Sequence, residues 1–291
     1  MTLAEKDTVK RLLISIAALA VAALACDISL PNIPRLQTIP TETLVVAEPL
    51  PDGETAEVEL RLGAGELTLS GGGEGLIGGE IRYNVAEWKP TVTRDGNRVH
   101  IEQDRMDSGS FGIIEGDVLN EWNLKLGNVP LKLKIDAGAY RGELDLSGVP
   151  LRRLDIADGA GTSTVKFESV NPEEMTELRY TTAASTVTLE GLANANFATM
   201  RFDGGAGTYT LDFSGELQRD ATVTITAGIC TLKIIIPEGT PAKINRSGAL
   251  TTVNTEGRWS VDGDTYEKSG NGPMLTINVE LDAGTLTLVN K

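Results

Sequence analysis

The chain has 291 residues, enough for one large β domain or two smaller ones, and its 41% hydrophobic and 23% charged residues are typical of a folded globular protein. Its 26 Lys and Arg against 41 Asp and Glu give a net charge of −15, which disfavours contact with the phosphates of a nucleic acid. One histidine and the single cysteine outside the N-terminal segment, Cys230, are too few for a zinc site built on these residues. We therefore expect no nucleic-acid partner and no metal or other cofactor.

Residues 1–25 have the pattern of a lipoprotein signal peptide. A basic segment at 6–11 precedes an uncharged apolar run at 12–25, which is shorter than the roughly 20 residues of a membrane-spanning helix. The run ends in Ala25 before Cys26, with small residues that resemble a bacterial lipobox. The resemblance implies cleavage between Ala25 and Cys26 and a lipid on the Cys26 thiol; ordinary signal cleavage before a free thiol is the alternative. We expect an extracytoplasmic protein that this lipid anchors to the bacterial cell membrane.

The next segment, residues 26–50, contains four of the 12 prolines. Because proline favours extended chain, the segment predicts a tether between the lipid and the folded domain. The apolar residues Leu44, Val45 and Val46 leave open the alternative that a first strand lies here.

Apolar and polar residues alternate through most of the mature chain. Two examples are residues 58–62 (Val-Glu-Leu-Arg-Leu) and 131–135 (Leu-Lys-Leu-Lys-Ile). A period of two is typical of β-strands, and the glycines between the runs are typical of turns. The sequence therefore predicts an all-β protein.

A longer repeat is superimposed on this alternation. Segments of the form apolar-x-apolar, a small turn residue and again apolar-x-apolar recur, with turn residues at Gly138, Gly161, Ser185, Gly207 and Gly228. These turn residues are 23, 24, 22 and 21 residues apart. A repeat of this length with strands in every unit indicates a solenoid. We predict a β-solenoid, a single-handed β-helix-like stack of repeats of about 22 residues.

The repeat divides the mature chain into unequal parts. Residues 51–105 predict a smaller and less regular β region, residues 106–122 a polar loop, and residues 123–291 the solenoid. Within the solenoid, Cys230 has the inward-facing parity of neighbouring Leu and Val residues, so we expect a buried structural thiol. The last repeat has no evident cap, and the N-terminal region or a second copy must cover its strands.

Residues 48–102 resemble the N-terminal part of the bacterial toast-rack family. The resemblance rests on Pro51-Asp52-Gly53, on residues 56–60 (Ala-Glu-Val-Glu-Leu), and on residues 63–69 (Gly-Ala-Gly-Glu-Leu-Thr-Leu) with the glycine-rich turn that follows. The array from 124 to 291 is similar to the β-solenoid of "putative adhesins" and of cell-wall-active antibiotic response proteins. The resemblance implies an envelope location and a solenoid architecture, and it carries no catalytic residues.

We find no set of catalytic residues in the sequence. A Ser-His-Asp site would have to use His100, the single histidine, and no Gly-x-Ser-x-Gly motif supplies a nucleophile. The glycines at 71–79 lack the Gly-Lys-Ser/Thr ending of a phosphate-binding loop. We expect His100 to lie on the surface without a role, and residues 71–79 to form a turn.

Aspartates recur just before the turns, at Asp136, Asp158, Asp203 and Asp282. Stacked at one corner of a solenoid, their carboxylates would form a weak Ca²⁺ site, but aspartate beside glycine is also ordinary turn chemistry. The Gly-Gly-x-Gly-x-Asp calcium repeat is absent from the sequence, and we favour turns. Calcium is therefore expected to leave the melting temperature unchanged, and a rise of several degrees would instead show a calcium site.

Two functions fit the sequence. The first is a non-enzymatic envelope lipoprotein whose solenoid surface binds an envelope protein or a cell-wall glycan, as an adhesin or as an accessory to the sensing of envelope stress. The alternative is an extracellular enzyme that acts on polysaccharides on the same scaffold. A carboxylate-lined groove beside Trp122 or Trp259 would favour the enzyme, and a face lined by threonine and serine would count against it.

Overall fold

The computed structural model describes residues 35–53, 55–103, 113–248 and 250–291. The predicted signal peptide, its cleavage site after Ala25 and the predicted lipid site at Cys26 lie outside the described residues. The chain divides into two compact units, residues 1–36 with 106–115 and residues 37–105 with 116–291. Of the first unit, residues 35–36 and the short strand β6 (Ile113–Glu115) are described. The second unit carries the architecture that follows.

Strands make up most of the described chain, and none of its helices is long and apolar enough to cross a membrane. Its helical segments are two short 3-10 turns, η1 (Ala86–Trp88) and η2 (Leu192–Ala195). The predicted all-β fold is confirmed. In chain order the other strands are β1 (Arg35–Glu48), β2 (Ala56–Gly73), β3 (Ile77–Val85), β4 (Pro90–Asp95), β5 (Arg98–Gln103), β7 (Asn120–Gly127), β8 (Leu131–Asp145), β9 (Leu151–Lys166), β10 (Met175–Glu190), β11 (Phe197–Asp212), β12 (Ala221–Ile236), β13 (Ala242–Ser247), β14 (Leu250–Glu256), β15 (Ser260–Asp262), β16 (Thr265–Lys268) and β17 (Leu275–Asn290).

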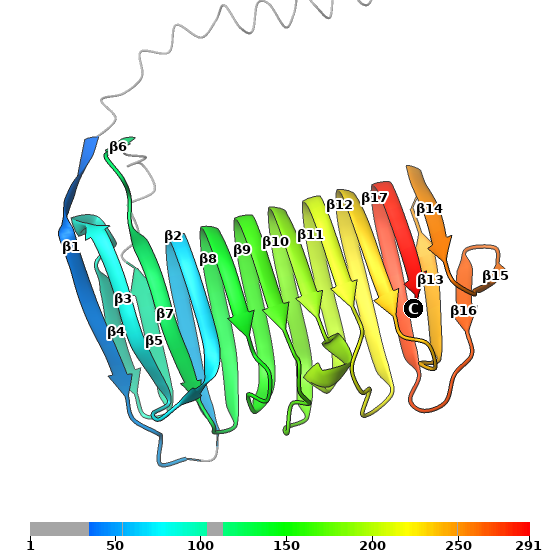
Figure 1. Ribbon diagram of the computed structural model, residues 1–291, viewed down its shortest axis with the longest axis horizontal. Coiled ribbons are helices and arrows are strands. Elements are labelled where there is room, and N and C mark those ends of the chain that lie inside the picture. The colour runs from blue at the N-terminus through cyan, green and yellow to red at the C-terminus, as the bar shows by residue number, and fades with distance from the viewer. Residues whose placement is uncertain (1–34, 54, 104–112, 249) are drawn as a thin grey trace, which may run out of the picture. The chain divides into compact units, whose positions relative to one another are not determined.

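Long strands that bend near their middle are the building unit of the fold. They are 15 to 18 residues long. In β8 the buried positions Leu131, Leu133 and Ile135 have one parity, whereas Tyr140 and Leu144 have the other. The change of parity at the bend keeps the same side of the chain turned inward on both arms. Figure 1 shows the long strands arching over along the upper edge of the molecule.

The two arms of these strands form two sheets, which we name sheet A (first arms) and sheet B (second arms). Neighbouring long strands pair in parallel in the order β2-β8-β9-β10-β11-β12-β17. Before β2, sheet A is extended by β5 and β4, and sheet B by β7, β3 and β1. Apolar side chains from both sheets meet in one continuous core. Each bent strand belongs to both sheets, so sheets A and B are continuous with each other through the bends.

The register of the paired strands fixes the repeat length. One set of paired residues just after the bend lies 21, 24, 22 and 23 residues apart, namely Tyr140, Gly161, Ser185, Gly207 and Cys230. The predicted β-solenoid with repeats of about 22 residues is confirmed. Gly138 and Gly228 are not equivalent to the other predicted turn residues, because each precedes its equivalent position by two residues.

Three predicted domain boundaries need correction. β1 occupies most of the predicted tether 26–50 and pairs with β3, so the alternative of a first strand at Leu44 to Val46 is the correct one. β2 pairs with β5 and β7 on one side and with β8 on the other. The regions predicted as separate, 51–105 and 123–291, therefore form one stack. β7 begins at Asn120, inside the predicted loop 106–122.

The last strand of the chain does not lie at the end of the stack. β17 pairs with β12 on one edge and with β13 and β14 on the other, so it inserts ahead of strands that precede it in sequence (Figure 1). Beyond β13, sheet A continues through β16 to β15. Trp259 and Tyr266 pack against the core at this end. The hairpin β15–β16 and these two rings therefore cap the solenoid from within the same chain. The expected cover by the N-terminal region is wrong, because β1 pairs with β3 at the opposite end of the stack.

Tyrosine rings fill the core where glycines leave room for them. A Cβ added at Gly142 would lie 2.5 Å from the Tyr140 ring, and one at Gly204 would lie 2.7 Å from the Tyr209 ring. Tyr209 meets Phe202 edge to face, with 4.9 Å between ring centroids. The missing side chains of the glycines are thus replaced by rings from neighbouring core positions.

Cys230 is a buried free thiol, as predicted. Its side chain lies in the same core, and burial raises the pKa of the thiol. A protonated thiol is a poor nucleophile, so the geometry fits a structural role.

The buried tyrosines make the fold sensitive to alkali. Burial, with the hydrogen bond and charge of Glu42, raises the pKa of Tyr83 to about 12. Burial is also the largest cause that raises the pKa of Tyr209 to about 12 and the pKa values of Tyr140 and Tyr180 above their ordinary value of 10.0. Because these folded values exceed the unfolded one, the neutral phenols contribute stability that is complete below about pH 10 and is lost as the pH rises towards about 12.

Tyrosinate absorbance and far-ultraviolet circular dichroism, recorded on one sample against pH, test this expectation. Most of the absorbance change should coincide with the loss of strand signal, because these phenols ionise as the fold opens. Full ionisation near pH 10 with the strand signal intact would contradict the burial of these rings.

Candidate functional site

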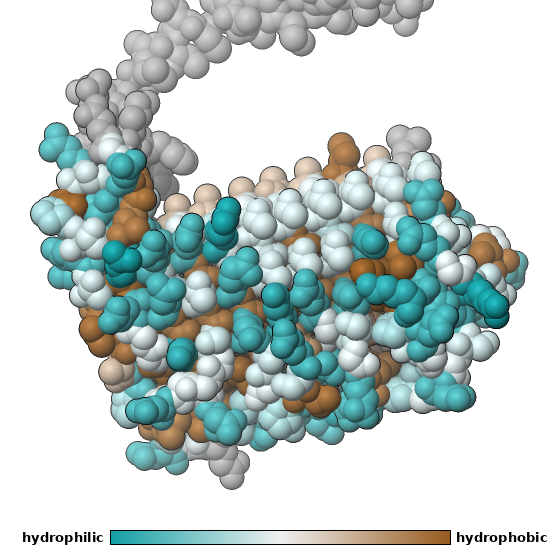
Figure 2. Space-filling model, in the orientation of Figure 1, coloured by the Kyte–Doolittle hydropathy of each residue, from teal (hydrophilic) through white to brown (hydrophobic). Residues whose placement is uncertain are grey.

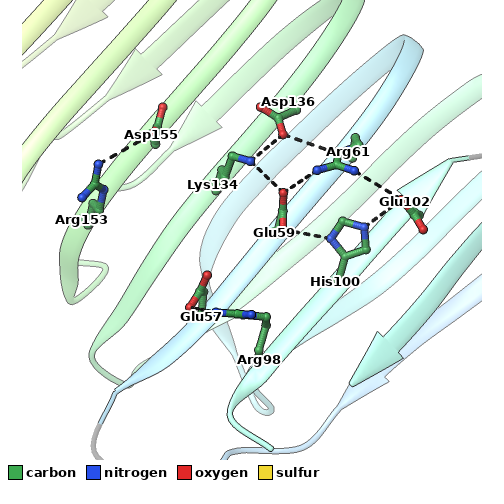
Figure 3. A network of polar contacts seen from close by, with 10 residues as sticks. All are labelled: Glu57, Glu59, Arg61, Arg98, His100, Glu102, Lys134, Asp136, Arg153 and Asp155. Carbon is green, nitrogen blue, oxygen red and sulfur yellow. Dashed lines mark hydrogen bonds and ion pairs between the residues drawn. The ribbon is translucent and has the colours of Figure 1, made fainter. Parts of the chain in front are cut away.

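The outer face of sheet A carries a network of paired charges at its N-terminal end (Figure 3). Lys134 Nζ on β8 lies 2.9 Å from Glu59 Oε1 on β2 and 2.9 Å from Asp136 Oδ2. Arg61 contacts the same two carboxylates, at 2.9 Å and 3.5 Å. The pairs Lys134–Glu59 and Arg61–Asp136 connect β8 to β2 across the face. Each pair contributes at most about 1 kcal/mol to stability because the groups are partly exposed.

His100 extends this network onto β5. Its Nδ1 lies 3.2 Å from Glu59 Oε2 and its Nε2 lies 2.9 Å from Glu102 Oε2. Burial favours a raised pKa for the Glu59 carboxyl, but the hydrogen bond and charge of Lys134, with the charges of Arg61 and His100, outweigh burial and leave that pKa lowered. The sequence predicted a surface histidine without a role, whereas the structure places His100 between Glu102 on its own strand and Glu59 on β2, so that the contact with Glu59 links β5 to β2.

The outer face of sheet B is different, because threonines line it in two rows. The paired residues of the first row are Thr162, Thr186, Thr208, Thr231, Thr285 and Thr252. A second row, two residues further along each strand, holds Thr164, Thr188, Thr210 and Thr287, with Lys233 between the last two. Parallel strands are about 4.8 Å apart, so the hydroxyl groups repeat at that spacing. Figure 2 shows a nearly white band of weakly polar side chains below the ridge formed by the bends.

A groove with a volume of about 980 Å³ opens beside Trp259 at the C-terminal end of the stack. The carboxylates of Glu238 and Glu267 line it, together with lysine and arginine side chains. The other tryptophan considered from the sequence, Trp122, is completely buried, and its Nε1 donates to Asn120 Oδ1 at 3.0 Å. A groove beside Trp259 and a threonine-lined face therefore both exist, on different parts of the surface.

The four aspartates proposed for a calcium site do not stack at one corner. Asp136 and Asp203 lie at equivalent register positions on the outer face but on strands separated by β9 and β10. Asp158 lies one position further along and is buried, and Asp282 is exposed near the bend of β17. Within the part of the chain that the structure describes, no three acidic, histidine or cysteine side chains are grouped so as to hold a metal ion.

Asp158 is instead the centre of a buried hydroxyl cluster. Tyr180 Oη donates to its carboxylate at 2.5 Å and Ser185 Oγ donates at 2.7 Å, and the hydroxyl of Thr182 also contacts it. A buried carboxylate is stable only when hydrogen bonds replace its hydration. Leu154, Ile156 and Asp158 share one parity, so period-two alternation already pointed this side chain inward.

Removal of this acceptor is expected to weaken the core. Asp158→Ala leaves the buried hydroxyl groups without their shared acceptor and should lower the free energy of unfolding by about 3 kcal/mol. Asp203→Ala is the matched control, because Asp203 is an outward aspartate paired with Arg201 at 2.7 Å, and its loss should change stability by at most about 1 kcal/mol. Urea unfolding followed by circular dichroism measures both. Equal losses would show that the cluster contributes nothing special.

These features define a two-sheet β-solenoid of bent strands, capped within its own chain. Residues 36–176 match the family described as the N-terminal domain of toast_rack, DUF2154. The resemblance to the toast-rack family that was expected from the sequence is therefore confirmed over this part of the chain.

Solved structures from three bacteria show weaker similarity. A "putative cell adhesion protein" from Clostridium sporogenes ATCC 15579 is 23% identical, with a TM-score of 0.47 over 86% of this chain and 99% of the other. A "putative adhesin" from Bacteroides fragilis NCTC 9343 is 9% identical, with a TM-score of 0.34 over 87% and 99% of the two chains. A "putative lipid binding protein" from Parabacteroides distasonis ATCC 8503 is 8% identical, with a TM-score of 0.39 over 87% and 99%. Among curated proteins, none matches this sequence.

The residues of the groove were missed by sequence reasoning, apart from Trp259. They come from segments near 240, 259 and 268, which the inserted strand β17 and the cap bring together. No local pattern in the sequence marks these segments as neighbours. The threonine rows did have a signal, since Thr-x-Thr recurs at residues 162–164, 186–188, 208–210 and 285–287.

Proposed function

We propose that this protein is a non-enzymatic, adhesin-like lipoprotein, held on the outer side of the cell membrane by a lipid on Cys26. Its threonine rows on sheet B bind another component of the envelope, a protein or a cell-wall glycan. The observation that supports this proposal most directly is the threonine array itself. It is a regular array of hydroxyl groups that contains one charged side chain, Lys233, in a chain whose net charge is −15.

A face of this kind suits binding better than catalysis. Its hydroxyl groups can donate and accept hydrogen bonds at a constant spacing, which fits an extended or repetitive partner. The charged groups of sheet A are largely paired with one another, so that face offers fewer free groups to a partner. The threonine face is therefore our candidate for the binding surface.

Site-specific photo-crosslinking in native envelopes tests the binding surface. A photoreactive residue at Thr208 on sheet B of the full-length chain should form a discrete adduct, whereas the same residue at Thr222, an exposed threonine on sheet A, should not. Mass spectrometry of the adduct identifies the partner and separates an adhesive role from an accessory role in envelope-stress sensing. Adducts of equal yield at both positions, or none at Thr208, would contradict the proposal.

The lipid anchor has its own test. Cells that express the full-length chain should incorporate labelled palmitate into it, and Cys26→Ser should remove the label and release the protein from the membrane fraction. Labelling that persists in the variant would contradict lipidation at Cys26.

The alternative function, a polysaccharide-acting enzyme, would use the groove beside Trp259. Glu238 and Glu267 both line this groove, but Glu267 Oε1 is paired with Lys243 Nζ at 2.8 Å. If the protein is such an enzyme, oligosaccharides mixed with it should become shorter with time, and Glu238→Gln should abolish this change. An unchanged mass profile favours the binding protein.

A further inference from the structure

The groove at the C-terminal end of the stack has a fixed aromatic wall. It lies between the return segment at 238–243, the turn at 258–260 and the segment at 267–270. Trp259 Nε1 donates to Glu256 O at 3.1 Å, and its ring packs partly against the core. With the ring held in this way, the part that faces the groove offers a preformed surface for stacking. Met274, 41% exposed, adds apolar surface in the same groove.

Two cations in this groove have no carboxylate partner among the described residues. Lys268 Nζ donates to Pro237 O and to Asn290 Oδ1, each at 2.6 Å. An ammonium group has three N–H donors, so a further one is available to a ligand. The exposed guanidinium of Arg258 makes no hydrogen bond or ion pair with any residue that the structure describes. Its planar fork is suited to bind a carboxylate through two hydrogen bonds.

The charges around the groove favour an anionic ligand. Lys243 is neutralised by Glu267, and Glu238 is a negative group close enough to Lys268 to oppose the effect of burial, which lowers the pKa of Lys268. The lysines and the arginine outnumber the glutamates by one among these side chains. In a chain with a net charge of −15, unpaired cations at one groove are complementary to an anionic ligand.

We propose that this groove binds a glycan that carries carboxylate groups. The apolar face of a sugar ring stacks on Trp259, and its carboxylate accepts hydrogen bonds from Arg258 and Lys268. A groove open to solvent lets the rest of the glycan chain continue beyond it. This inference names a ligand class and a second surface for the proposed function, and it rests on that function only for the extracytoplasmic location where such glycans occur.

Isothermal titration calorimetry on the full-length chain in detergent provides the test. The probes are tetragalacturonic acid, peptide-free glycan strands with muramic lactyl carboxylates, the neutral tetrasaccharide cellotetraose, and tetraglutamate as an anion without sugar rings. We expect saturable binding of at least one acidic glycan, with affinity for cellotetraose about tenfold or more weaker. Preference between the two acidic probes tells whether the ligand is of the wall type or of the uronate type. Higher salt should weaken the binding.

Arg258→Gln is the decisive variant, because the exposed side chain has no partner whose loss would affect folding. It should reduce the affinity about tenfold, while Arg141→Gln, an exposed arginine on sheet B, should not change it. Trp259→Phe, which keeps a ring in place, should weaken binding less than Arg258→Gln. Equal binding of cellotetraose, equal binding of tetraglutamate, or full affinity in Arg258→Gln would each overturn the proposal.

The two proposals can fail separately. Crosslinking at Thr208 is independent of the groove, and calorimetry with purified glycans is independent of any partner on sheet B. Binding of an acidic glycan without adducts at Thr208 would leave the groove assigned and refute the threonine face.

Discussion

Removal of β17 is expected to disrupt the C-terminal part of the stack, although it removes only the end of the chain. A chain that ends at residue 274 lacks the strand that joins β12 to β13 and β14. The side chains of β17 that are at most 5% exposed are Leu275, Ile277, Val279, Leu281, Leu286, Leu288 and Val289. At about 1.5–3 kcal/mol for each buried side chain, their combined loss is comparable to the whole stability of a typical domain, roughly 5–15 kcal/mol. We expect aggregation through the exposed edge of β12.

A larger internal deletion is the control for this truncation. Replacement of residues 237–274 by a copy of the return loop 213–220 removes β13 to β16 but keeps β17 on β12. This chain should fold, with a lower melting temperature because its end is uncapped. Size-exclusion chromatography and thermal unfolding compare the two chains with the parent. A truncated chain that stays monomeric and melts like the parent would contradict the insertion of β17.

The architecture was predictable because its determinants are local and repeated. Alternation of apolar residues identified the strands, and the recurrence of small residues near the bends gave the repeat of about 22 residues. The exact equivalence of the bends was not predictable. Glycine occurs both before the bend, as at Gly138, and after it, as at Gly161, and the pairing of strands shows that these two are not equivalent.

The position of β17 could not be read from the sequence. Its apolar pattern is the same as that of β12, so a strand with that pattern fits at any place in the stack. In sequence, β13 to β16 lie between β12 and β17. After β16 the chain returns to the edge of β12, where β17 pairs with β12 on one side and with β13 on the other. The groove beside Trp259 is formed by this arrangement of strands. Its cations, Arg258 and Lys268, could therefore not be predicted from the sequence, although Trp259 was considered.

The candidate aspartates show what the odd or even position of a residue along its strand can predict. Asp136 follows the buried Ile135 and Asp203 follows the buried Phe202, so both point outward, whereas Asp158 has the parity of the buried Ile156. Strict period-two alternation is therefore enough to separate Asp158 from the other aspartates by sequence position alone. What alternation cannot supply is the partner set, since Tyr180, Thr182 and Ser185 come from the next strand in the stack.

Substitution of Gly161, at the bend of β9, is expected to have a large effect on stability. Gly161 has a φ of 146°, a conformation that residues with a side chain rarely adopt. A Cβ at this position would lie 1.9 Å from the carbonyl oxygen of Tyr140 on the neighbouring strand. The backbone of β8 cannot move away without breaking its ladder with β9. We expect Gly161→Ala to lower the free energy of unfolding by at least about 3 kcal/mol.

Gly63 provides the matched control, because it lies near the bend of β2, has no positive φ, and leaves a Cβ without any neighbour within 4 Å. Gly63→Ala should be neutral or should stabilise the fold by about 0.4–1 kcal/mol, since alanine reduces the conformational freedom of the unfolded chain. Urea unfolding of the two variants under the same conditions measures the difference. If both variants are as stable as the parent, the bends do not depend on close approach of neighbouring strands, and the alternation of Gly65, Tyr140, Gly161 and Ser185 at this register position has no structural cause.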